Sequence, residues 1–330
     1  MARVGVDFRS HGLSAGTTIN DANIGSFAYS GATLDTTVTG TGTITAQGTG
    51  IARFADPDAS SSAYVETVTA LTGDKFSGMI LLDACPTPTG NYRMWQIRNA
   101  ANSADALRLM LNASRSFHIE NSAGTVIAGP SAAVGTGAAV RVNLSGDFSA
   151  QTARLDVWTT NPATNAGAAD WSSGALTARN WNSETGIGRS RVGAPHSSAV
   201  SGNVDMAYAV LDDSTEAVLA PLTATLTAGT ETTVAASTIS GVTGGTGPYS
   251  IVGATQTAGT SIGTLTFTGL TVWGAQLNVN EVTLNVTVED SLGGQVVQAV
   301  TIPAPSGGGG GEFLWDLAKV GGAGFVGFGG

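Results

Sequence analysis

The sequence predicts an all-β protein in which a large two-sheet sandwich is followed by a smaller β-sandwich and a short tail. Short runs of alternating apolar and polar residues, rich in β-branched side chains, recur along the chain. Turn residues such as those at 72–74 and 145–147 separate the runs, and no convincing helical pattern interrupts them before residue 220. Because 42% of the 330 residues are hydrophobic, the chain is expected to bury a core and to fold.

The large sandwich is predicted from residue 22 to residue 220, after an N-terminal segment of residues 1–21. In residues 94–98 and 107–111, apolar side chains alternate with polar or cationic ones. Each such strand is expected to cover the core with one face and to meet water with the other. Many short strands without a long helix favour two packed sheets. The predicted strands span residues 33–39, 63–69, 76–82, 92–98, 106–111, 116–121, 140–144, 154–159, 181–187 and 204–210.

A second, smaller sandwich is predicted in residues 221–304. The boundary follows from a change in composition, because no Lys or Arg occurs between Arg191 and Lys319. The number of strand candidates suits an immunoglobulin-like (Ig-like) sandwich, although the Cys…Trp…Cys pattern of antibody domains is absent. Trp273 is the candidate for the corresponding core position. The candidate strands span residues 223–227, 232–236, 249–252, 263–267, 281–288 and 295–302.

The C-terminal end reads as a tethered docking peptide. Residues 305–311 form a Gly-rich linker, and residues 312–330 form a hydrophobic tail in which 313–320 has the pattern of a short amphipathic helix. So short a helix needs a partner to bury its apolar face. Membrane insertion is the alternative, although the helix is short and lacks a basic face. The residues expected to dock are Phe313, Leu314, Trp315, Leu317, Val320, Phe325 and Phe328.

The first region also resembles a known group of modules. The segment 92–98, the hairpin of 107–111 and 116–120, and the closing segment 206–213 carry the likeness. With them, the region resembles the laminin-G and concanavalin-like jelly-roll modules that are common in minor tail proteins and fibres of bacteriophages. Ig-like domains are frequent companions of such modules in phage virion proteins. The resemblance implies a two-sheet, lectin-like jelly roll in a virion structural protein.

A stretch rich in tryptophan, amide and arginine side chains is the candidate for saccharide binding. Sugar sites need an aromatic platform for the ring faces, with planar amides, Arg or Asp at the edges to bond the hydroxyls. Trp181 is equally consistent with a core position, because large aromatic residues dominate sandwich packing. The candidate residues are Asp170, Trp171, Asn180, Trp181, Asn182, Arg189, Arg191 and His196.

Composition and spacing argue against several other functions. A net charge of −10 repels phosphate backbones, so nucleic acid is not an expected partner. The acidic residues are scattered singly along the chain, as at Glu66, Glu120, Asp156 and Glu184, whereas a glycosidase needs paired carboxylates. The Glu-x-Asp-x-x-Glu strand of jelly-roll hydrolases is absent. The histidines lack zinc-site spacing, and no phosphate-binding loop is present.

No cofactor is expected. Some lectin-like sandwiches hold calcium at a loop edge with oxygen ligands. Asp56, Asp58, Asp212 and Asp213 are the candidate ligands, and solvated acids at turns and strand ends are the favoured alternative. The single cysteine, Cys85, is interpreted as a small buried hydrophobe.

These observations predict a non-enzymatic structural and adhesion component of a phage or phage-like virion, a minor tail or fibre protein that contacts host-surface glycans. A capsid decoration protein or head fibre is the alternative, and a carbohydrate-active hydrolase is a weaker one. The expected partners are other virion proteins, further copies of the chain and a host polysaccharide. The N-terminus lacks the apolar core of a signal peptide, and no span of membrane length occurs. We therefore expect synthesis in the host cytoplasm and display on the particle exterior.

Overall fold

The computed structural model describes most of the chain before residue 305. The described ranges are 3–9, 13–29, 32–48, 50–56, 61–163, 167–195, 202–219, 223–228, 236–244, 248–259, 263–274, 281–290 and 295–304. His196, the linker 305–311 and the docking tail 312–330 lie outside them.

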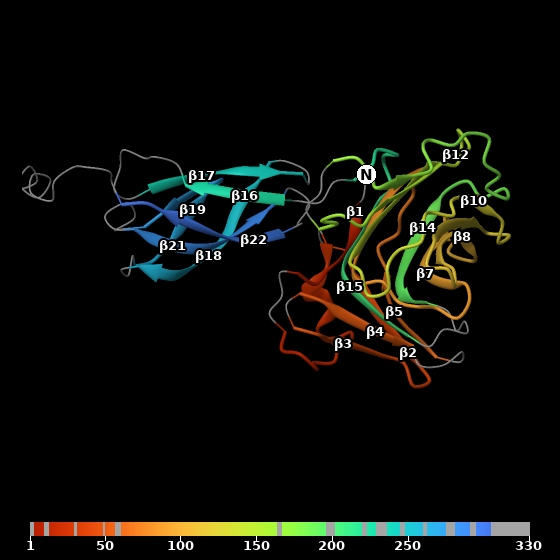
Figure 1. Ribbon diagram of the computed structural model, residues 1–330, viewed down its shortest axis with the longest axis horizontal. Coiled ribbons are helices and arrows are strands. Elements are labelled where there is room, and N and C mark those ends of the chain that lie inside the picture. The colour runs from red at the N-terminus through yellow and green to blue at the C-terminus, as the bar shows by residue number, and fades with distance from the viewer. Residues whose placement is uncertain are drawn as a thin grey trace, which may run out of the picture.

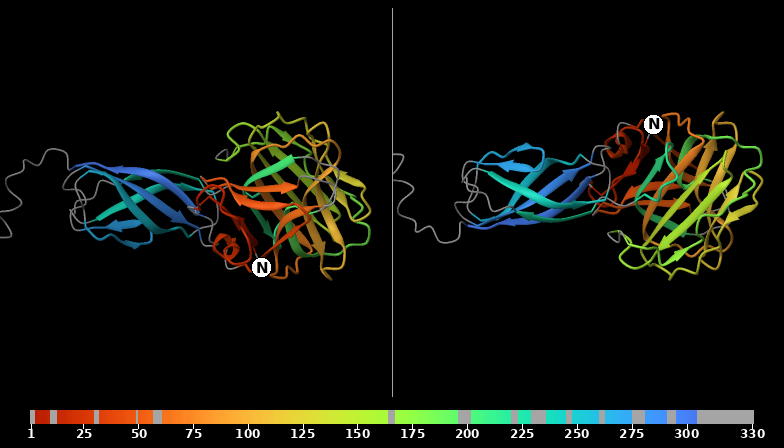
Figure 2. Two further views of the ribbon diagram at one scale, coloured as in Figure 1. Left: turned by 90° about the horizontal axis from the view of Figure 1, so that it is seen from below. Right: turned by 90° about the horizontal axis from the view of Figure 1, so that it is seen from above.

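Two β bodies follow one another along the long axis of the molecule (Figure 1). The strands from β1 (Arg3–Asp7) to β15 (Gly202–Asp212) form the first body, and those from β16 (Thr223–Ala228) to β22 (Gln295–Ile302) form the second. Views from below and above show the same two bodies (Figure 2). The described residues contain one helical segment, the 3-10 turn η1 (Ile24–Phe27), and no helix long and apolar enough to cross a membrane. The prediction of an all-β protein is confirmed.

The first body is a sandwich of two antiparallel sheets. One sheet has eight strands, in which β1 pairs with β15 outside the main path. Its other strands follow the order β13 (Trp171–Ser172), β12 (Thr152–Trp158), β11 (Val140–Asp147), β6 (Lys75–Ala84), β15, β4 (Ala52–Asp56) and β3 (Thr43–Ala46). The other sheet has seven strands. Their order is β10 (Val126–Ala128), β9 (Phe117–Asn121), β8 (Asp105–Leu111), β7 (Tyr92–Asn99), β14 (Ile187–Ala194), β5 (Ser62–Thr67) and β2 (Leu34–Thr39).

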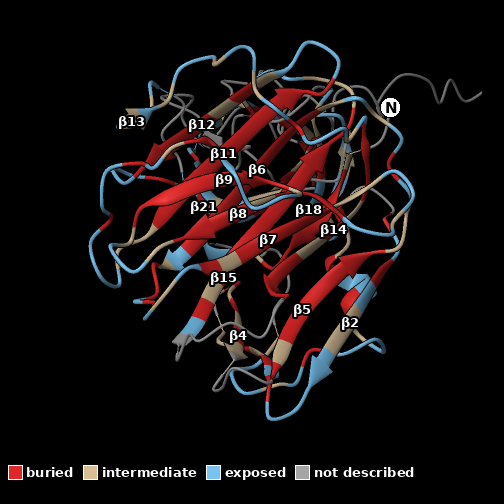
Figure 3. Ribbon diagram, turned by 90° about the vertical axis from the view of Figure 1, so that its right-hand side faces the viewer, coloured by how far each residue is buried: buried red, intermediate tan, exposed pale blue. Residues whose placement is uncertain are grey.

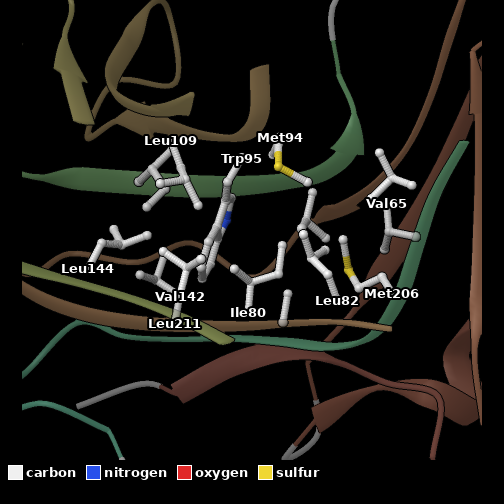
Figure 4. Packing of buried hydrophobic residues seen from close by; sticks show 14 of the residues in the cluster. Val65, Ile80, Leu82, Met94, Trp95, Leu109, Val142, Leu144, Met206 and Leu211 are labelled. Carbon is white, nitrogen blue, oxygen red and sulfur yellow. The ribbon is translucent and has the colours of Figure 1, made fainter. Parts of the chain in front are cut away.

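The core of this sandwich lies between the two sheets. Apolar side chains at alternate strand positions point inward from both sides, as the period of a half-buried strand requires (Figure 4). Trp95 of the seven-stranded sheet reaches across to Gly78 of the eight-stranded sheet. A Cβ on Gly78 would lie only 2.8 Å from Cη2 of Trp95, so the indole occupies the space that a side chain at residue 78 would need.

The second body contains two smaller antiparallel sheets around a separate core. The four-stranded sheet has the order β16, β17 (Ala236–Thr243), β20 (Thr271–Trp273) and β19 (Thr266–Thr268). The three-stranded sheet has the order β18 (Ser250–Gly259), β21 (Val282–Glu289) and β22. The expected core role of Trp273 was wrong. Val272 takes the inward position of β20 and is fully buried, so the next residue, Trp273, points outward and is 43% exposed.

Two details of the first body differ from the sequence-based expectations. Residues 3–7, assigned to a separate N-terminal segment, form β1 within the eight-stranded sheet. The strand expected at 181–187 is absent because Asn182 and Ser183 adopt positive φ angles of 55° and 66°, which end extended structure there. The strand begins instead at Ile187 and continues to Ala194.

Candidate functional site

Asp170 and Trp171 stabilise a loop at the edge of the eight-stranded sheet. The Oδ2 atom of Asp170 accepts hydrogen bonds from the backbone N–H groups of Thr159 (2.6 Å) and Thr160 (2.8 Å). These bonds hold the pKa of Asp170 below its ordinary range. Trp171 is half-buried and packs against the main core. The carboxylate of Asp170 is thus hydrogen-bonded within its own loop, and Trp171 is only partly exposed.

Trp181 lies in the core, which was the alternative to a role in saccharide binding. Its ring centroid is 4.7 Å from that of Phe148 and 5.7 Å from that of Phe76, and the residue is almost fully buried. It therefore does not present a face to solvent. Its neighbours Asn180 and Asn182 are exposed, and Asn182 donates a hydrogen bond to Ser122 in the turn after β9. The expected aromatic platform is absent at Trp181.

Arg189 and Arg191 lie elsewhere, on the outer face of the seven-stranded sheet. They alternate along β14 with the inward-facing Ser190, and both pair with Glu66 of the neighbouring strand β5. Arg189 Nη1 is 3.5 Å from Glu66 Oε1, and Arg191 Nε is 3.2 Å from Glu66 Oε2. The Arg191 guanidinium also lies 5.3 Å from the ring centroid of Tyr64. The structure therefore separates the candidate residues that it describes into three places and does not assemble them into one site.

Glu66 and Arg191 belong to a continuous row of polar side chains that crosses five strands. Residues directly opposite each other in neighbouring strands share a face of the sheet. The strand registers place the row on β5, β14, β7, β8 and β9, in the order Glu66, Arg191, Gln96, Arg108 and Glu120. Figure 3 looks onto this sheet and shows that its central strands are buried along most of their length.

More charged residues flank this row on the same sheet face. We call the whole surface the charged face. It consists of Glu66, Arg93, Gln96, Arg98, Asp105, Arg108, His118, Glu120, Arg189 and Arg191. The exposed Asp35 lies opposite Glu66 on the edge strand β2 and extends the row there.

Asp105 is the centre of the charged face. Its carboxylate lies 2.7 Å from Arg108 Nε, 3.0 Å from Arg98 Nη1 and 3.3 Å from Arg93 Nη1. Gln96 Nε2 donates a further hydrogen bond to it. Burial alone would raise the pKa of Asp105, but the hydrogen bond from Arg108 and the charges of Arg93 and Arg108 outweigh it. The pKa therefore lies below its ordinary value, and the carboxylate stays ionised.

A second carboxylate, Glu120, extends the network onto β9. Its Oε1 lies 3.2 Å from Nε2 of His118, and its Oε2 lies 3.8 Å from Nη1 of Arg108. Arg108 thereby bridges Asp105 and Glu120. The structure places His118 on the outer face of the sheet with a low exposed fraction.

The network has spare hydrogen-bonding capacity. Gln96 Oε1 and Arg93 Nε are buried and have no hydrogen-bond partner. Most buried polar atoms in proteins do have partners, so two such atoms beside one carboxylate need an explanation. Burial, together with the positive charge of Arg108, lowers the pKa of Arg93. Another negative charge nearby would therefore stabilise the charged form of the Arg93 guanidinium.

Glu66, Asp105 and Glu120 were not predicted as members of one site, because the strands that carry them become neighbours only in the folded sheet. Arg191 and Glu66, for example, are separated by 125 positions. The alternation of polar residues in 94–98 and 107–111 was the available signal, but only the strand register places these side chains next to one another.

The candidate calcium ligands have other partners where the structure describes them. Asp212 forms an ion pair with Arg3 at 3.0 Å, and Asp213 accepts a hydrogen bond from the backbone of Thr72. Among the described residues, no group of three or more His, Cys, Asp or Glu side chains is arranged to hold a metal ion. Asp58 and the side chain of Asp56 lie outside the described part of the structure.

Comparisons with known proteins found similarity only to solved structures. No family model matches the chain, and no curated protein matches it. A Trypanosoma rangeli sialidase in complex with 2,3-difluoro-KDN aligns with 64% of this chain at 12% identity and a TM-score of 0.39. This chain spans only 30% of that sialidase. The metal-free exoplasmic/lumenal domain of VIP36 aligns with 55% of this chain and 85% of its own length, at 10% identity and a TM-score of 0.39. The phage setting stays a prediction.

Proposed function

We propose that this chain is a non-enzymatic adhesion component of a phage or phage-like particle and that it binds host-surface saccharide through the charged face. The observation that carries the proposal is the row of side chains from Glu66 to Glu120. Five strands at the usual spacing give this row a length of about 19 Å. Guanidinium, amide and carboxylate groups along it supply both donors and acceptors for sugar hydroxyls.

The carboxylates of the charged face suit binding better than hydrolysis. A glycosidase places two carboxyl groups about 5–10 Å apart and keeps one of them protonated as a general acid. Glu66 and Glu120 stand at opposite ends of the row. Asp105 lies between them, but contacts with three arginines lower its pKa, which is the opposite of what a general acid requires. These features support a binding role without catalysis.

Saccharide binding is tested by changing one ion pair of the row without changing the net charge. The variant Glu66→Gln/Arg191→Gln removes one negative and one positive group. The matched control, Arg53→Gln/Asp205→Asn, removes a 2.7 Å ion pair from β4 and β15 of the other sheet. Binding to immobilised polysaccharide from susceptible cells is expected to fall for the first variant and to persist for the control. Equal binding by both variants would contradict the proposal.

The virion part of the proposal is supported by the jelly-roll resemblance and by the hydrophobic tail beyond the Gly-rich linker. In the proposal, other virion subunits hold the tail, and several copies of the chain stand on the particle exterior. Full-length protein and a version that ends at Ser306 are mixed with particles lacking the protein, and binding is followed by sedimentation and electron microscopy. Only the full-length chain is expected to bind. Labelling on the tail of the particle would support the adhesion role, whereas labelling on the head of the particle would favour the decoration alternative.

A further inference from the structure

The water-facing layer of the charged face is richer in arginine than in carboxylate. The side chain of Asp105 is only 5% exposed, whereas those of Arg93 and Arg108 are 14% and 19% exposed. Around Asp105, three guanidinium groups lie against one carboxylate, and the Glu120 carboxylate is nearest to His118. The most accessible charges in this area are therefore positive, although the chain as a whole carries −10.

The arginines around Asp105 differ in how fully their N–H groups are used. Arg98 donates to the backbone oxygen of Asn102 at 3.0 Å, and Arg108 donates to the backbone oxygen of Ser122 at 3.3 Å, in addition to their bonds to Asp105. Arg93 makes its ion pair with Asp105 and leaves Nε without a hydrogen-bond partner. Because a guanidinium carries several N–H donors, Arg93 keeps donors for a further acceptor.

The spare acceptor of the network lies on the same strand. Gln96 donates to Asp105 through Nε2, but its Oε1 has no partner and the residue is about as buried as Asp105 itself. An unused donor and an unused acceptor therefore flank the same carboxylate. Both atoms are shielded from solvent, so a ligand reaches this cluster through the partly exposed guanidinium groups of Arg93 and Arg98, which suit a carboxylate.

We infer that the charged face binds an acidic saccharide, with the sugar carboxylate held by the partly exposed guanidinium groups of Arg93 and Arg98. The inference rests on the proposed saccharide-binding function and adds the class of ligand. Planar guanidinium groups recognise carboxylates through paired hydrogen bonds, which makes arginine better suited to this role than lysine. Asp105 keeps the empty site from carrying too much positive charge.

The test compares one polysaccharide in two charge states. Polygalacturonate and its methyl ester share a backbone, and only the free acid carries carboxylates. Dextran serves as an unrelated neutral polymer. Binding of the full chain is measured by calorimetry at low and high salt. We expect binding to polygalacturonate that weakens with salt, because screening reduces charge pairing, and at least about tenfold weaker binding to the ester.

Two variants with opposite expected effects separate recognition from stability. Arg93→Gln/Arg98→Gln is expected to lower affinity for polygalacturonate at least about tenfold. Its control, Arg53→Gln/Arg154→Gln, changes the net charge equally on the eight-stranded sheet and should leave affinity unchanged. Asp105→Asn is expected to raise the affinity, because it removes the negative charge that competes with the ligand. A purely structural role predicts no gain for this variant.

The outcomes distinguish the inference from the function on which it rests. Equal binding to the acid and the ester, or to dextran, would overturn the acidic ligand but leave the saccharide-binding proposal standing. The acidic ligand is likewise rejected if Asp105→Asn, measured well below its own melting temperature, binds polygalacturonate no more tightly than the unchanged chain. If no polysaccharide binds, including the extract from susceptible cells, both proposals fail.

Discussion

Trp95 Nε1 donates a hydrogen bond of 2.6 Å to Ser190 Oγ inside the sandwich. The two residues lie on adjacent strands, β7 and β14, and both are buried. Because successive side chains of a strand point to opposite faces, an inward Ser190 requires Arg189 and Arg191 to point outward. The buried hydrogen bond between Trp95 and Ser190 and the ion pairs to Glu66 therefore depend on the same register of β14.

Ser190→Ala is expected to destabilise the first body by about 1–3 kcal/mol, because it leaves the indole N–H of Trp95 buried without an acceptor. Urea unfolding followed by circular dichroism measures the change. Ser172→Ala is the control, since Ser172 is exposed on the edge strand β13. A loss no larger than that of the control would mean that the Trp95 bond contributes little to stability.

Trp181→Ala is expected to lower the free energy of unfolding by about 3–5 kcal/mol, as is usual when a large aromatic side chain is removed from a core. Trp181 packs against Phe76 and Phe148, and its own Nε1 has no hydrogen-bond partner, so the loss comes from packing. Thermal unfolding checks this. Trp273→Ala removes an indole that is 43% exposed and should cost about 1 kcal/mol or less. Similar losses for both variants would contradict the core assignment of Trp181.

The strands were predictable where local alternation is strong. The structure has β7 at Tyr92–Asn99 and β8 at Asp105–Leu111, each within one residue of the expected bounds. The expected strand at 181–187 failed because its aromatic start is held by tertiary packing. Its next two residues, Asn182 and Ser183, take turn conformations that polar residues favour.

The charged face could not be predicted in the same way. Some of its ion pairs, such as that between Arg191 and Glu66, join side chains that are distant in sequence, and they depend on which strands become neighbours in the sheet. A shift of one residue in register would turn Arg191 into the core. The sequence therefore revealed polar alternation along single strands, whereas the grouping around Asp105 is a property of the folded sheet.

Cys85 is expected to resist thiol reagents in the native protein. Burial raises its pKa to about 11, so little thiolate forms at pH 8, and the side chain is almost fully enclosed. Ellman's reagent should label very little of the folded chain and one thiol per chain in urea, which matches the single cysteine. Rapid and complete labelling of the folded protein would show that the segment around Cys85 opens readily.

Asp105→Asn is expected to destabilise the protein at pH 7 by about 2 kcal/mol, because three arginines lose their shared carboxylate. The folded pKa of Asp105 lies below its ordinary value of 3.8, so its contribution is complete above that pH. It is lost as the pH falls through the folded pKa. The difference in stability between the variant and the unchanged chain should therefore shrink below about pH 3.8.

Urea unfolding at pH 7 and near pH 3 measures this difference in stability. Asp83→Asn, which removes an exposed carboxylate at the end of β6, controls for the general effect of charge. A difference that stays constant between the two pH values would mean that Asp105 is not held ionised by its arginines.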